Sequence, residues 1–85
     1  MSKSFTYAGE AYEMEKRSPS GAIHTTIHVD LGNQPTFIRT LTIFGTYKDA
    51  KAFTVKCLKA AAQIREFRKE GKFAEANDLE RSTFQ

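Results

Sequence analysis

The amino-acid sequence predicts an α+β fold of a single domain, residues 1–85, with the element order β-β-β-α-α. Short segments of residues 1–45 alternate apolar with polar residues, as antiparallel strands do, whereas residues 47–69 repeat apolar residues at helical spacing. We therefore expect a three- or four-stranded antiparallel sheet from residues 1–45, covered by one long α-helix. A short C-terminal helix follows, so that residues 46–85 form a helical hairpin.

The long helix is the clearest element. Between residues 47 and 69, spacings of three and four place one stripe of side chains on the same face: Ala50, Phe53, Cys57, Ala60, Ile64 and Phe67. Thr46 is the expected N-cap, with Asp49 in the first turn, and Gly71 is the expected left-handed residue after the last turn. The helix would be roughly 35 Å long, enough for one end to extend past a small sheet.

The first strand segment changes phase. Phe5 and Tyr7 occupy odd positions, whereas Tyr12 and Met14 occupy even ones, and Gly9 lies between the two pairs. Because a strand has a period of two, this change requires either a bulge in one strand from residue 5 to residue 16 or a tight hairpin at Gly9. Residues 1–4 are expected to be loose, and the Ser-Pro-Ser-Gly sequence at 18–21 predicts a turn.

Two further strands are predicted at residues 22–30 and 36–44, joined by a loop at 31–35. Their apolar row would face the long helix and consists of Ile23, Ile27, Val29, Phe37, Leu41 and Ile43. Threonines and histidines dominate the opposite row, which would meet water. We expect Ile27, Leu41, Phe53 and Ile64 to be buried together.

The second helix is predicted at residues 72–82, with Phe73, Ala76 and Leu79 as its apolar stripe. Residues 82–85 are expected to fray.

The charge of the chain is modest overall but uneven. The net charge is +3, yet residues 46–72 carry eight basic and three acidic groups, a net +5. Such a helix could meet an acidic partner or a phosphate backbone, although a solvated helix face is the simpler explanation. The single cysteine, Cys57, falls on the apolar stripe and is expected to pack in the core. With no possible intramolecular disulfide, no signal-like N-terminus and no membrane-length apolar run, a cytoplasmic location is expected.

Motifs for catalysis, cofactors and metals are missing from the sequence. No glycine-rich phosphate loop is present, and the carboxylates are scattered, so we predict neither an enzyme nor a cofactor. His24 and His28 would lie about 13 Å apart on one strand, too far for one ion to bridge. Arg39 lies on the apolar row, where it must reach the edge, pair with Glu13 or Glu15, or hold an anion.

Our main hypothesis is a non-enzymatic protein-binding or inhibitor domain that forms a homodimer. Aromatic residues beyond what one helix can bury would anchor the interface, which we place at the helical end together with the last residue of the predicted strand at 36–44: Phe44, Ile64, Phe67, Phe73 and Leu79. Ile38 and Phe84 are also expected to be partly exposed. Phage-encoded accessory proteins often have this size, so a viral accessory role is one form of the hypothesis.

Two alternatives remain open. The first is nucleic-acid binding through the basic helix, and the second is a small anionic ligand held by Arg39 and the threonine- and histidine-rich face. The basic side chains that would make either contact are Arg39, Lys51, Lys56, Lys59 and Arg65.

Overall fold

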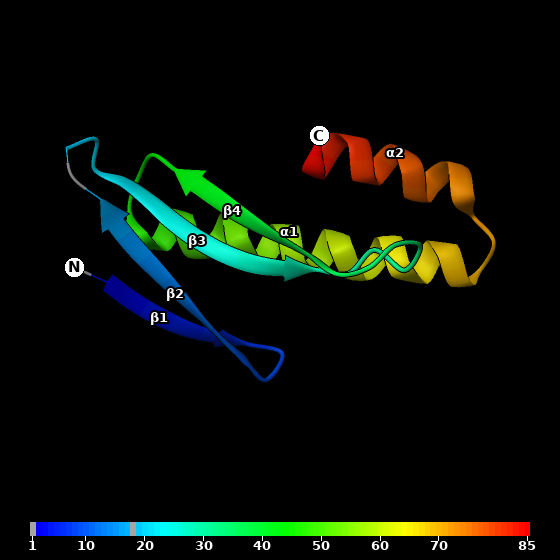
Figure 1. Cartoon of the computed structure of the whole chain (residues 1–85), viewed down its shortest axis with the longest axis horizontal. Coiled ribbons are helices and arrows are strands. Elements are labelled where there is room, and N and C mark those ends of the chain that lie inside the picture. Colours follow the sequence, from blue (N-terminus) through cyan, green and yellow to red (C-terminus); the bar gives the residue numbers. More distant parts are fainter. Residues whose placement is uncertain (1, 18) are drawn as a thin grey trace.

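The computed structural model describes residues 2–17 and 19–85. Four strands form one antiparallel sheet in chain order: β1 (Ser2–Tyr7), β2 (Glu10–Arg17), β3 (Ala22–Val29) and β4 (Phe37–Ile43). Two helices follow, α1 (Tyr47–Lys69) and α2 (Phe73–Phe84), with α1 along one face of the sheet and α2 folded back beside its C-terminal half (Figure 1). The predicted α+β fold is confirmed, in its four-stranded form. Among the described residues, no helix is long and apolar enough to cross a membrane.

A tight hairpin at Gly9 explains the change of phase. Ala8 and Gly9 both have positive φ, +51° and +82°, and Tyr7 lies opposite Glu10. This is a two-residue turn of type I′, whose twist matches that of the strands it joins. Phe5 stacks on Tyr12 with ring centroids 5.4 Å apart, so the odd positions of β1 share a face with the even positions of β2.

The N-terminal prediction was wrong for residues 2–4, which belong to β1. They are ordered because β1 pairs with β2 along its whole length, starting with Ser2 opposite Glu15. Met1 and Ser18 lie outside the described residues, so part of the predicted turn at 18–21 is not described. At the end of this turn, the Gly21 amide donates to the Arg17 carbonyl at 2.8 Å.

The ends of α1 are where the sequence placed them. The Thr46 hydroxyl accepts from the Asp49 amide at 3.1 Å, and the Asp49 carboxylate accepts from the Thr46 amide at 3.0 Å, which makes a reciprocal capping box. These hydrogen bonds lower the pKa of Asp49. At the other end Gly71 has φ +77°, and the Lys72 amide donates to the Phe67 carbonyl at 2.8 Å.

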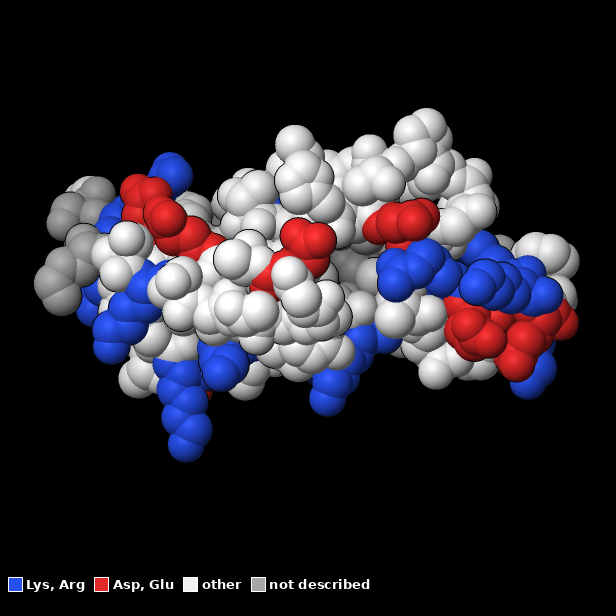
Figure 2. Space-filling model, turned by 90° about the horizontal axis from the view of Figure 1, so that it is seen from below, with Lys and Arg blue, Asp and Glu red and all other residues white. Residues whose placement is uncertain are grey.

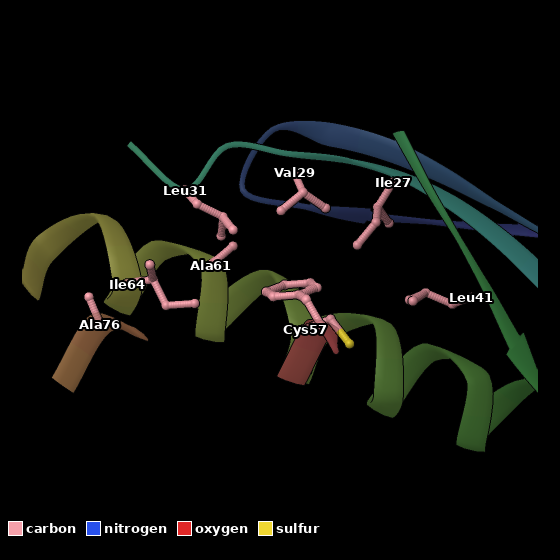
Figure 3. Packing of buried hydrophobic residues seen from close by; sticks show 9 residues of the cluster. Ile27, Val29, Leu31, Leu41, Cys57, Ala61, Ile64 and Ala76 are labelled. Carbon is pink, nitrogen blue, oxygen red and sulfur yellow. The ribbon is translucent and has the colours of Figure 1, made fainter. Parts of the chain in front are cut away.

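The buried stripe of α1 is rotated from the predicted one. It consists of Ala50, Thr54, Cys57, Ala61 and Ile64. Phe53 was predicted in the core but is 41% exposed, and Thr54 takes the buried position. Burial of that threonine is tolerated because its hydroxyl donates to the Ala50 carbonyl at 2.8 Å. Figure 3 shows Ala61 pointing from α1 toward Leu31, and Ile27 and Leu41 are buried in the same cluster as Ile64, as predicted.

The C-terminal end of the chain is helical and packs into the core, which contradicts the prediction that residues 82–85 fray. α2 continues to Phe84, and the prediction that Phe84 is partly exposed was also wrong, because it is only 4% exposed. Its side chain belongs to the same buried cluster as Val29 and Cys57. Burying a phenylalanine contributes about 1.5–3 kcal/mol, which holds the last turn of α2 against the rest of the domain.

Candidate interaction surface

The sheet has one covered face and one open face. α1 lies along the first face, and the second carries the polar row predicted from the sequence (Figure 1). On that open side, the Thr26 and Thr40 hydroxyls are 3.5 Å apart. Ile38 and Phe44 interrupt this polar row, with 65% and 77% of their surface exposed. These are large apolar side chains that the domain leaves in water.

Both of these side chains belong to β4 or to the residue directly after it. Within the described part of the chain, β4 pairs with β3 only, so the backbone on its other long side has no strand partner. No residue of α2 comes within 8 Å of a β4 residue, measured between Cα atoms. We call the free long side of β4, together with Ile38 and Phe44, the β4 edge.

The helical end of the molecule, where the sequence suggested an interface, is largely closed by the chain itself. Ile64 is fully buried, and Phe67 and Leu79 are partly buried against the main core cluster. Phe73 is 60% exposed at the start of α2. Of the five predicted interface residues, only Phe44 and Phe73 are therefore largely exposed, and they lie at opposite ends of α1.

Arg68 closes the helical end. Its side chain is only 7% exposed, and it donates to the Leu31 carbonyl at 2.6 Å and to the Glu80 carboxylate at 2.8 Å. A further hydrogen bond reaches the Asn77 side chain at 3.1 Å. One guanidinium thus joins the β3–β4 loop, α1 and α2. Sequence reasoning missed this role, although Arg68 continues the spacing of the buried stripe four residues after Ile64.

Several predicted basic contacts are occupied within the chain. Arg65 donates to the Asp30 carbonyl at 2.7 Å, and the Lys51 ammonium lies 5.8 Å from the centre of the Phe5 ring. Lys56 and Lys59 are exposed and remain available. Figure 2 shows basic side chains spread along one face and mixed with acidic ones at the end where α1 meets α2, without a continuous basic stripe on that face.

Arg39 pairs with neither of the predicted glutamates. It lies opposite Ile27 on the helix side of the sheet. Met14 also faces the helix side, so Glu13 and Glu15, which alternate with it along β2, lie on the open side. In the described ranges it makes no ion pair or side-chain hydrogen bond. It lines a hollow of about 460 Å³ together with Phe37, Phe84 and other residues of the β3–β4 loop and α2. The predicted pairing with Glu13 or Glu15 is therefore wrong, whereas the other two alternatives, reaching the edge of the sheet and holding an anion, stay predictions.

The groups with shifted pKa values are poorly suited to nucleophilic or base chemistry. Burial raises the pKa of the Cys57 thiol, more strongly than Lys56 and Arg39 lower it. Burial also raises the pKa of Tyr12, and Glu10 and Tyr7 add to this effect. Both groups are therefore protonated at neutral pH. Among the described residues, no three histidine, cysteine or acidic side chains gather as a metal site would require.

No protein-family model, curated protein or solved structure was found to match this chain. The β4 edge must therefore be interpreted from its own chemistry.

Proposed function

We propose that this chain is a cytoplasmic, non-enzymatic protein-binding domain that binds its partner through the β4 edge. The observation that supports this most directly is the exposure of Ile38 and Phe44, 65% and 77%, at an edge strand whose outer side has no strand partner among the described residues. Large apolar side chains exposed in water are typical interface anchors, and an edge strand offers a row of free amides and carbonyls to another chain. Such a domain would act on its partner as an inhibitor or accessory subunit.

Homo-oligomerisation fits the same proposal. A chain of 85 residues has a small core, and association supplements the stability of small domains. The interface proposed from the sequence at the helical end is replaced by the β4 edge, because Ile64 is enclosed and Arg68 and α2 cover much of the remaining apolar surface there.

Nucleic-acid binding is the second candidate, and the net +5 charge of residues 46–72 favours it. Lys56 and Lys59 are exposed and could contact phosphates. Arg65 and Arg68, however, hold the β3–β4 loop, so two of the strongest phosphate ligands in this segment are already used. A small anionic ligand at Arg39 is a third candidate, since this guanidinium lines a hollow and makes no ion pair with any of the described residues.

The proposal is tested by affinity capture on the immobilised chain, before and after nuclease treatment, at low and physiological salt. We expect a captured protein to survive nuclease and salt and to be lost with the double variant Ile38→Glu and Phe44→Glu. Phe73→Glu is the control, since it adds one glutamate, against two in the double variant, at another exposed aromatic side chain. Capture that disappears with nuclease, or that falls steeply with salt, would favour nucleic acid instead. Capture unchanged by the double variant would contradict a role for the β4 edge.

A further inference from the structure

We infer that the β4 edge binds the β4 edge of a second copy of this chain, as an antiparallel strand pair with Leu41 opposite Leu41 of the second copy. This inference depends on the proposed function, because it takes the β4 edge to be a protein-binding surface. It adds the identity of the partner and the register of the pairing.

Symmetry restricts the possible registers. In a two-fold dimer each copy contributes the same strand, and the pairing is symmetric about the axis. A register can therefore be named by its central residue, which lies opposite the same residue of the second copy. Residues opposite each other must also point to the same side of the sheet. Registers centred on a residue of β4 satisfy both conditions, and they differ in which side chains meet and in how much of β4 is paired.

The register centred on Leu41 joins the two exposed apolar side chains. It places Ile38 opposite Phe44 of the second copy, and by symmetry it makes the same pair again at the other end. Thr40 lies opposite Thr42 of the second copy, and Arg39 lies opposite Ile43. A cross-strand pair of an aromatic and a β-branched residue stabilises a sheet, and no like charges face each other. Both exposed side chains of the β4 edge are thus covered at once.

Neighbouring registers leave these side chains with polar partners. A centre at Thr40 places Ile38 opposite Thr42, and a centre at Thr42 places Phe44 opposite Thr40. A centre at Arg39 brings two guanidinium groups opposite each other, which is unfavourable. The pattern of exposed residues therefore favours the centre at Leu41.

The opposite edge of the sheet does not offer the same complementarity. On the open side of β1 the residues are Ser2, Ser4 and Thr6, which bury little apolar area in any pairing. A strand added to β4 would lie about 4.8 Å away, closer than any α2 backbone, since no Cα atom of α2 lies within 8 Å of β4. β4 is therefore the edge at which a second copy would bind.

Cysteine cross-linking reads the register directly. The native Cys57 is buried and serves as a silent background. Mixing a Thr40→Cys variant with a Thr42→Cys variant and oxidising mildly should give a disulfide-linked dimer, whereas each variant alone should give little. Thr40→Cys alone forming the dimer would indicate a centre at Thr40, Thr42→Cys alone a centre at Thr42, and either result would overturn the inferred register. A Ser4→Cys variant mixed with Thr6→Cys is the matched control on the β1 edge.

Sedimentation equilibrium separates this inference from the proposed function. We expect a reversible dimer in the micromolar range, with Ile38→Glu and Phe44→Glu together raising its dissociation constant by about a hundredfold or more and Phe73→Glu leaving it unchanged. A monomer at every concentration overturns self-pairing, while the proposed function survives if Ile38- and Phe44-dependent capture of another protein persists. A dimer that the double variant leaves intact overturns self-pairing at the β4 edge. If capture is also unchanged by the double variant, the proposed function fails as well.

Discussion

Replacing Arg68 by alanine should destabilise the domain far more than its position near a helix end suggests. The substitution leaves the Leu31 carbonyl without its 2.6 Å donor and leaves the Glu80 carboxylate, 19% exposed, without its cation. Hydrogen bonds to charged groups contribute about 1.5–3 kcal/mol, and breaking a buried pair costs about 3–5 kcal/mol. Because water can partly resolvate Glu80, we expect a loss of about 2–4 kcal/mol.

Urea denaturation followed by circular dichroism measures this loss, since the chain has no tryptophan for fluorescence. The control is Arg81→Ala, which removes an exposed pair with Asp78 and should cost about 0–1 kcal/mol. Adding Glu80→Ala to Arg68→Ala should cost less than the sum of the two single changes, because the carboxylate then no longer lacks a partner. If Arg68→Ala cost no more than Arg81→Ala, the role of Arg68 in joining loop and helices would be refuted.

Three further measurements test the core and the cap. Ile64→Ala should cost about 2–5 kcal/mol in chemical denaturation, and Phe53→Ala should cost clearly less; equal losses would mean that the buried stripe is misplaced. The buried Thr25 hydroxyl has no hydrogen-bond partner among the described residues, so Thr25→Val should raise the free energy of unfolding by about 1 kcal/mol, and a lower value would argue against an unsatisfied hydroxyl. The lowered pKa of Asp49 means that its charged form stabilises the fold above the ordinary aspartate pKa and that this stabilisation is lost as the pH falls through the lowered value. Stability curves from neutral to acid pH should therefore fall less steeply for Asp49→Asn, unless the capping box is absent in solution.

Features that depend on local sequence were predictable. Thr46, Asp49 and Gly71 define the ends of α1 because their capping preferences act within one turn of the helix. The alternation in β3 and β4 likewise gave the correct rows facing the helix, since the period of a strand is independent of its neighbours, although in β4 only Leu41 of that row is fully buried. Local rules left Gly9 open, because both a bulge and a hairpin change the phase of a strand.

Features that depend on packing across the chain were not predictable. The buried face of α1 depends on how the helix lies against the sheet, which the local sequence does not show. In the structure Phe53 therefore lies outside the core in which it was predicted, and Thr54 lies inside it. The burial of Phe84 requires α2 to fold back along α1, and no local pattern of residues 82–85 indicates that. Leu31 was predicted as a loop residue, and its burial also depends on contacts with a distant part of the chain. Arg65 and Arg68 of α1 hold the loop that carries it through hydrogen bonds to backbone carbonyls.

The same difference between local and distant information determines the candidate site. From the sequence, the apolar residues near the end of α1 looked like surplus surface, because nothing local shows that α2 and Arg68 cover them. The sequence did predict that Ile38 is partly exposed and that Phe44 belongs to an interface, but nothing local shows that both lie on one free strand edge. Once the strand order places β4 at a free edge, their exposure and their spacing of six residues acquire a common explanation. A strand paired with its own copy about Leu41, the residue midway between Ile38 and Phe44, brings these two positions together from opposite ends, which neither residue alone would suggest.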